Sequence, residues 1–359
     1  MEAEATNRID AIQNYRVQIL WKIAVICIGL VALVVISVFA VTIGTHNISM
    51  GDAFRIIWDH ICGHEYETGS AEWWDSYVIW EERLPRIFAA IFAGMGLAVA
   101  GVVMQCMLRN PLADPYTTGI SSGAMVGIAA AITLGIVVPM FTDELGLMTN
   151  AFITGLIPAL VIVGVTKMRS SSSATIILSG LAMSFMFGAI TQMIMMGAEA
   201  EKSQEVYKWM VGTLNYVVSD KIPLMAVMTL AGSIFFLAMS KQLNLISLGD
   251  TGAKSLGLNA ESFRNVCLLV MSFMIAEQVS VTGILGFVGL VVPHMMRMVV
   301  GADSRFLIPA SMVFGGAFVV LSDIIARTVL DGISVGVVVS SIGGPLFLIF
   351  IIWKRKEIW

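Results

Sequence analysis

Long uncharged apolar segments recur along almost the whole chain, and they restrict the possible folds more than any other feature. A helix needs about 20 apolar residues to cross the hydrocarbon core of a bilayer. Ten segments come close to that length, near residues 23–45, 87–108, 116–140, 147–166, 174–197, 222–240, 265–282, 283–299, 306–326 and 334–353. Only 13% of the residues are charged, whereas soluble domains have about one quarter. The sequence therefore predicts an all-α polytopic membrane protein with about ten transmembrane helices.

Basic residues divide unequally between the two sides of these predicted helices. If the N-terminus is cytoplasmic, 14 of the 21 Lys and Arg residues fall in inner segments and 7 in outer ones. This ratio agrees with the positive-inside rule, and an even number of spans returns the C-terminus to the cytoplasm. We therefore expect a multi-pass protein of the cytoplasmic membrane with both termini inside.

The segments define a single transmembrane domain over residues 1–359. We expect a cytoplasmic tail over 1–22, an outer link over 46–82 and a cytoplasmic link over 245–261. The first apolar segment is too long for a signal-peptide core, so we expect it to remain as a membrane span. The four cysteines are scattered and form no CxxC pair, which indicates neither a disulfide framework nor a zinc site.

Two outer segments, 48–61 and 203–218, carry apolar residues at helical spacing and contain tryptophan. Such segments are typical of amphipathic helices at the membrane interface, where tryptophan and tyrosine are favoured. A tryptophan-anchored interfacial loop is the alternative for each segment.

The link RNPLADP, residues 109–115, joins two apolar segments and contains two prolines. Proline removes a backbone donor and disfavours helix in the residue before it, so Pro111 and Pro115 predict a non-helical bend. Non-helical backbone at membrane depth is tolerated only against protein or water. We expect the link to pack at the inner mouth of a pathway, with Asn110 and Asp114 satisfying backbone groups.

Four sequence blocks carry a resemblance to a known family. They are RLPRIFAAIFAGMGLAVAGVVMQ (83–105) with RNPLADPYTTGISSGA (109–124), LGDTGAKSLGLNAESFRNV (248–266), GILGFVGLVVPHMMRMVVGADSRFLIPAS (283–311) and LSDIIARTVLDGISVGVVVSSIGGPLF (321–347). In this order they resemble the FecCD/BtuC-like permease family of ABC importers for iron siderophores, haem and vitamin B12. The first 80 or so residues match only in hydropathy.

The resemblance implies a BtuC-like, type II permease fold and a set of partners. The subunit would form a homodimer around a central pathway, with two cytoplasmic ATPase subunits beneath it and an extracytoplasmic substrate-binding protein above it. Membrane lipid is expected as a further partner, and nucleic acid is not. The resemblance implies no permanently bound cofactor, since ATP would be held by the partner subunits.

The resemblance also assigns roles to individual positions. Arg83, Arg86 and Arg327 correspond to arginines that meet acidic residues of the binding protein, although arginines at helix ends also snorkel toward the interface. The inner gate is expected at Asn110, Leu112, Ser172 and Ser173. The link 245–261 corresponds to the cytoplasmic coupling helices of the family, which sit in a groove of the ATPase. Coupling is expected at Asp250, Thr251, Gly252, Ala253, Lys254, Ser255, Leu256 and Gly257.

The coupling segment also resembles a phosphate-binding loop, in GDTGAKS (249–255). The P-loop pattern requires glycine directly before the lysine, where Ala253 stands, and a preceding strand, which the sequence does not predict. We therefore expect a transport subunit and no enzyme, with ATP hydrolysed by a separate partner.

Two acidic residues lie inside predicted spans, where charge is costly and normally faces a cavity or a partner. Glu277 either faces the pathway, where it can meet a cationic or metal-bearing substrate, or lies near the outer end and hydrates the mouth. Asp323 is four residues before Arg327, a spacing that predicts a helical ion pair.

The outer link contains HICGH, whose His60, Cys62 and His64 are weak candidates for a metal site. Three alternating ligands without a fourth are more typical of a passing turn, so we expect no metal site.

Taken together, these features predict the permease subunit of an ABC importer for an iron chelate, haem or cobalamin. A permease for another metal or metal complex is the alternative, with Glu277 and the HICGH segment as its hints. A membrane-embedded enzyme is an alternative of another class, because His294, Glu277 and Ser172 supply polar groups. No nucleophile elbow, HExxH motif or paired intramembrane Asp supports it.

Overall fold

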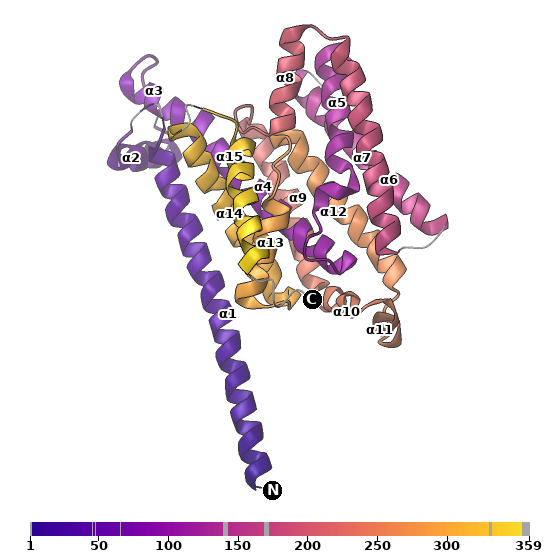
Figure 1. Ribbon diagram of the computed structural model, residues 1–359. Helices are drawn as coiled ribbons and strands as arrows, with labels where there is room; N and C mark the ends of the chain where they lie inside the picture. Colours follow the sequence, from indigo (N-terminus) through magenta and orange to yellow (C-terminus); the bar gives the residue numbers. More distant parts are fainter. Residues whose placement is uncertain are drawn as a thin grey trace.

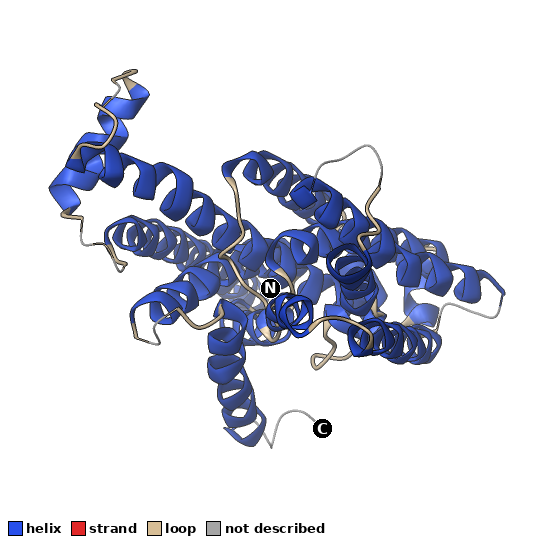
Figure 2. Cartoon of the chain, turned by 90° about the horizontal axis from the view of Figure 1, so that it is seen from above, coloured by secondary structure: helices blue, strands red, loops and turns tan. Residues whose placement is uncertain are grey.

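The computed structural model describes residues 2–44, 46, 48–64, 66–138, 143–168, 172–329 and 332–353. Helices make up almost all of this part of the chain, and no strand occurs in it (Figures 1 and 2). The prediction of an all-α protein is confirmed.

Ten apolar helices correspond to the ten predicted spans. They are α1 (Glu2–Thr42), α4 (Leu84–Leu108), α5 (Ile120–Leu134), α6 (Asp143–Met168), α7 (Ser173–Met196), α9 (Ile222–Ala238), α12 (Ala260–Thr282), α13 (Val288–Val300), α14 (Ser304–Thr328) and α15 (Val335–Trp353). In the described chain seven segments are long and apolar enough to cross a membrane, and α5, α13 and α15 give shorter apolar helices.

Shorter elements fill the links. They are α2 (Met50–Ile61), α3 (Ala71–Tyr77), the π-helical turn η1 (Val78–Arg83), η2 (Pro115–Thr118), α8 (Ala200–Val211), η3 (Ser219–Lys221), α10 (Ser240–Ser247) and α11 (Asp250–Ser255). The link 46–82 thus contains α2, α3 and most of η1, and the link 245–261 contains α11.

Helices α4 and α12 form the centre of the bundle, and most of their side chains are buried. Small residues allow other helices to approach α4 closely: Gly94 lies against Gly315 of α14, and Gly101 lies against Gly289 of α13. A Cβ at Gly94 or Gly101 would overlap the partner backbone. Helices in lipid associate through close backbone approach of this kind, because burial of apolar surface contributes little driving force for association there.

Two predicted boundaries of the apolar helices differ from the structure. Helix α1 starts at Glu2, so the described part of the expected tail 1–22 is helical, and this end of α1 projects well beyond the bundle (Figure 1). The span expected over 283–299 begins only at Val288, because Phe287 has a left-handed backbone with φ 66°.

The helix predicted over 203–218 is α8, and it ends at Val211 because Gly212 has φ 80°. Part of its apolar face is buried within the protein, since Val206 and Trp209 are buried and α8 packs against α5. By contrast, α2 exposes Phe54, Trp58 and other apolar side chains, as an interfacial helix would.

Candidate docking and coupling sites

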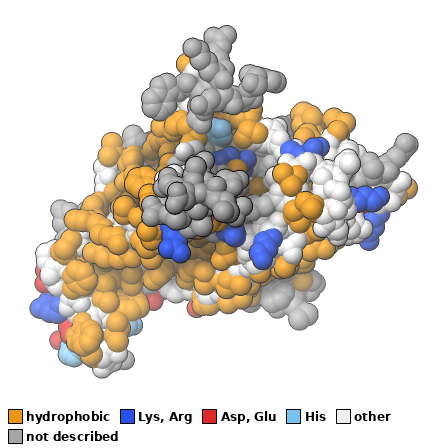
Figure 3. All heavy atoms as spheres, turned by 90° about the horizontal axis from the view of Figure 1, so that it is seen from below, with side chains coloured by type: hydrophobic (Ala, Val, Ile, Leu, Met, Phe, Trp, Pro, Cys, Tyr) orange, Lys and Arg blue, Asp and Glu red, His pale blue; other side chains and the backbone are white. Residues whose placement is uncertain are grey.

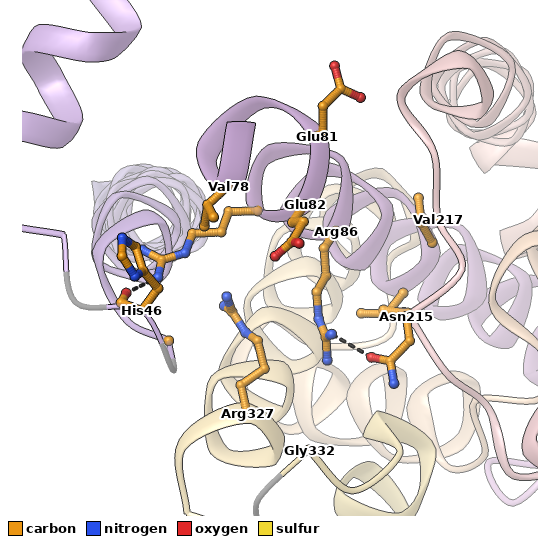
Figure 4. A pocket seen from close by; sticks show the side chains of 12 residues that line it. His46, Val78, Glu81, Glu82, Arg86, Asn215, Val217, Arg327 and Gly332 are labelled. Carbon is orange, nitrogen blue, oxygen red and sulfur yellow. Dashed lines mark hydrogen bonds between the residues drawn. The ribbon is translucent and has the colours of Figure 1, made fainter. Parts of the chain in front are cut away.

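A cavity of about 440 Å³ opens at one end of the bundle, where α1 and α14 end and α4 begins (Figure 4). Arg86 and Arg327 reach into the same space from α4 and α14, whereas Glu81 lies at its edge with the carboxylate directed outward. The cavity is lined by Gly44, His46, Val78, Glu81, Glu82, Arg83, Arg86, Leu214, Asn215, Val217, Arg327 and Gly332. The structure therefore brings together the three arginines expected to meet a binding protein.

A single buried carboxylate holds two of these arginines. Asp323 Oδ1 lies 2.6 Å from Arg86 Nε, and Asp323 Oδ2 lies 3.0 Å from Arg327 Nε. Arg86 also donates a hydrogen bond of 2.5 Å to Asn215. The predicted ion pair between Asp323 and Arg327 is confirmed. Arg86, 237 positions away from Asp323, completes a triad that no local spacing indicated.

The third arginine has a different environment. Arg83 is only 4% exposed, and its guanidinium donates to the backbone carbonyls of Val41, at 2.6 Å, and His46. Arg327 likewise donates to the carbonyls of Ala40 and Ile43. The last carbonyls of a helix have no partner within the helix. Arg83 and Arg327 therefore cap the end of α1 and fix it beside α4 and α14.

At the opposite end of the bundle, α11 is joined to α12 by an ion pair. Arg264, which is 1% exposed, donates two hydrogen bonds to the Asp250 carboxylate, one of them from Nη1 at 3.0 Å. This contact holds the pKa of Asp250 below its ordinary range. Arg264 Nε also lies 3.4 Å from the Met107 carbonyl at the end of α4. A planar guanidinium suits such paired contacts.

The remaining positions of the expected coupling segment form a polar, mostly exposed surface. Ala253 is buried, whereas Thr251, Lys254, Ser255 and Leu256 are exposed. Gly257 has φ 85° and makes the turn that leads into α12. The segment is therefore a short helix with one buried side, as the sequence predicted.

A cavity of about 530 Å³ beside α11 is lined by Asp250, Lys254 and Arg264, and also by Ser172. Ser172 is the N-cap of α7, where its Oγ accepts a hydrogen bond from the Thr175 N–H at 3.1 Å. One of the expected gate residues thus lies next to the coupling segment. The neighbouring Ser173 Oγ is buried.

The link 109–115 has the predicted bend. Arg109 adopts a left-handed backbone at the end of α4, with φ 51°, and the Asn110 side chain accepts from the Leu112 N–H at 2.9 Å. Asp114 accepts from the Tyr116 N–H at 2.9 Å and caps η2, which Pro115 begins. Asn110 and Asp114 satisfy backbone groups, as predicted, and the exposed Leu112 projects from the link.

The remaining candidates lie apart from these sites. Glu277 is buried in a groove between α6, α9 and α12. His60 stacks on Trp80, with ring centroids 4.2 Å apart, and Cys62 and His64 are exposed. Among the described residues no three His, Cys, Asp or Glu side chains are grouped as a metal site requires. His294 packs against Phe347 of α15 and does not line the Glu277 groove.

Comparisons with known proteins agree on the family of this chain. Residues 30–354 match the FecCD transport family. The chain is 39% identical over 271 residues to a cobalamin import system permease of Halobacterium salinarum, covering 74% of this chain and 71% of that protein. It is 32% identical to a hemin transport system permease of Yersinia pestis, covering 91% and 95%.

Among solved structures, an ABC transporter described as of the metal-chelate type, in an inward-facing conformation, matches with a TM-score of 0.80 at 29% identity. The match covers 92% of this chain and 99% of that one.

Proposed function

Because the chain belongs to the FecCD transport family of ABC importer permeases, we propose that it moves an iron chelate, haem or cobalamin across the cytoplasmic membrane. As an ABC permease it is a transport component and not an enzyme. The main structural support is a pair of sites at opposite ends of one bundle. One is the arginine-lined cavity, and the other is α11, which an ion pair joins to the central helix α12.

The arginine-lined cavity is the proposed docking site for the substrate-binding protein. A guanidinium has five N–H donors. Arg86 therefore keeps further donors beyond those that bind Asp323 and Asn215, and Arg327 keeps further donors beyond those that bind Asp323 and the carbonyls of Ala40 and Ile43. Carboxylates of the partner can accept from these donors. Arg83 contributes differently from the expectation of direct contact, because burial and two backbone carbonyls occupy its guanidinium.

The segment around α11 is the proposed contact with the ATPase. The ion pair between Asp250 and Arg264 connects α11 directly to α12, and α12 crosses the bundle to Thr282, near the docking cavity. Movement of α11 by a closing ATPase would therefore tilt α12 and change the access of the pathway from one side to the other.

The orientation we propose places both termini and α11 in the cytoplasm. Basic side chains gather on the face from which the N-terminal part of α1 projects (Figure 3), and positive charge favours the cytoplasmic side. We further propose a homodimer with two ATPase subunits. The inner gate is proposed at Asn110, Leu112, Ser172 and Ser173, where the two copies approach one another.

The relatives carry different substrate names, so the substrate requires direct measurement. The test is ATPase activity of the purified complex with its binding protein in lipid nanodiscs, screened with ferric siderophores, haemin and cobalamin. We expect one of these to stimulate hydrolysis. A complex that forms but responds only to another metal or metal complex would support the alternative substrate class, and failure of any ATPase to associate would overturn the importer assignment.

A further inference from the structure

A lateral groove of about 200 Å³ lies between three helices, away from the docking and coupling cavities. It is on the same side of the bundle as the docking cavity, because the Thr282 carbonyl at the end of α12 accepts from the Thr213 N–H, next to Leu214 of that cavity. The groove is lined by Leu145, Met148, Thr149 and Phe152 of α6, Lys221, Leu224 and Met228 at the start of α9, and Glu277, Ser280 and Val281 of α12.

The carboxylate of Glu277 is the unusual feature of this groove. The residue is 2% exposed, and neither carboxylate oxygen has a hydrogen-bond partner in the described part of the chain. The nearby Ser280 hydroxyl donates to the Glu277 backbone carbonyl at 2.7 Å and not to the carboxylate. Burying such a group without a partner is costly, and in a membrane it usually marks a cavity or a ligand.

The other walls of the groove are almost entirely apolar, with Lys221 as the second charged group. Lys221 does not donate to Glu277, since neither carboxylate oxygen has a hydrogen-bond partner in the described part of the chain. Glu277 lies five residues before the end of α12, or about 7.5 Å below it at the helical rise. A molecule that reaches this carboxylate must therefore pass Lys221 or enter from the lipid, in contact with aliphatic side chains.

We propose that the groove binds an alkylammonium group, with the ammonium at the Glu277 carboxylate and the aliphatic part against Leu224, Met228 and Phe152. An ammonium supplies the donors that the carboxylate lacks, and charge-assisted hydrogen bonds are the strongest of their kind. The ligand would connect α12 to α6 and α9. The site is separate from the docking and coupling cavities, since it shares no lining residue with either of them.

The test uses the full chain in nanodiscs made of phosphatidylcholine and phosphatidylglycerol, which carry no primary amine. Octylammonium is the probe, and octanol is the uncharged control of equal length. Octylammonium should raise the unfolding temperature at concentrations where octanol does not, and Glu277→Gln should weaken the apparent affinity at least about tenfold. Equal responses of the wild type and Glu277→Gln would overturn the proposal.

A second variant keeps the test decisive if Glu277→Gln fails to fold. Leu224 is 55% exposed, so Leu224→Trp can fill the groove without removing the carboxylate. It should abolish the response to octylammonium, and an unchanged response would contradict the assigned position.

The variant Lys221→Gln distinguishes two natural sources of the amine, a free hydrophobic amine and an aminophospholipid. For a free hydrophobic amine, removal of the like charge at the rim should tighten binding. For an aminophospholipid, whose phosphate can pair with Lys221, the same change should weaken stabilisation by phosphatidylethanolamine added to the nanodiscs.

Discussion

Asp323 determines the arrangement of the docking cavity at the scale of single residues. Its carboxylate is buried and bonded to both Arg86 and Arg327, so it keeps two like charges close together. We predict that Asp323→Asn destabilises the protein by about 3 kcal/mol, because breaking a buried ion pair leaves its partners uncompensated. Thermal unfolding in detergent measures the loss. Glu81→Gln, at an exposed position of the same cavity, is the matched control and should change little.

Arg83 and Arg86 are three positions apart, yet their environments predict different effects. Arg86→Gln should weaken association with the binding protein about tenfold, since one charge-assisted contact is lost. It should lower the unfolding temperature less than Asp323→Asn does, because the Asp323 carboxylate keeps its ion pair with Arg327. Arg83→Gln should mainly lower the unfolding temperature, because the capping of α1 is lost. Titration of the binding protein against both variants, with exposed Arg55→Gln as control, separates the effects. The reverse pattern would contradict these roles.

Local spacing predicted only some of these contacts. The pair of Asp323 with Arg327 follows from a separation of four residues on one helix, and the Asn110 and Asp114 contacts follow from turn chemistry. The contact of Arg86 with Asp323 depends on how α4 packs on α14, and that of Arg264 with Asp250 on the turn between α11 and α12. No single-sequence pattern specifies either.

At the scale of elements, the proposed coupling role of α11 depends on its ion pair with α12. We predict that Asp250→Asn lets the ATPase hydrolyse ATP while substrate uptake falls about tenfold or more, because α11 is no longer held to Arg264. Parallel measurement of hydrolysis and uptake in proteoliposomes tests this, with Glu72→Gln, at an exposed position of α3 far from α11, as control. Normal coupled uptake in Asp250→Asn would exclude the ion pair from the mechanism.

The same ion pair has a defined pH dependence. The pKa of Asp250 is lowered in the folded protein by the hydrogen bonds from Arg264. The stabilisation is therefore fully present above the unfolded pKa of about 3.9, and it is lost as the pH falls through the lower folded value. Coupling through this pair should consequently be constant between about pH 5 and 8. A decline of coupling within that range, measured by uptake per ATP, would contradict this assignment.

Close helix packing around α4 gives a further prediction. Gly101→Ala should destabilise the protein by about 1–3 kcal/mol, because the new Cβ would overlap the backbone of Gly289 and separate α4 from α13. Gly164→Ala on α6 is the matched control, since a Cβ there meets nothing within 4 Å. The control should be neutral or slightly stabilising. Equal unfolding temperatures for the two variants would show that the contact is not tight.

Hydrophobic length predicted the number and order of the apolar helices, because the bilayer imposes that length on each span. It did not predict where helices end inside the protein. Phe287 takes a left-handed backbone that delays α13, and Gly212 ends α8. Both boundaries depend on the packing of the loops 212–214 and 283–287, where the Thr213 N–H bonds the Thr282 carbonyl. Hydropathy does not report such contacts.

In the whole molecule, the proposed docking and coupling sites lie at opposite ends of one bundle, and α12 runs between them. Composition and hydropathy alone predicted a multi-pass membrane protein, and the ordered sequence blocks predicted the permease family, which the comparisons confirm. The proposed function includes an assembly of two copies of this chain with two ATPase subunits and a substrate-binding protein. It requires a measurement on the complex.

The most direct measurement is uptake of a ferric siderophore, haemin or cobalamin into proteoliposomes that contain this chain with its ATPase and binding protein. We predict accumulation inside the vesicles that requires ATP on the side of α11 and the binding protein on the side of the arginine-lined cavity. Accumulation that is independent of ATP, or that requires the two partners on the opposite sides, would contradict the proposed importer.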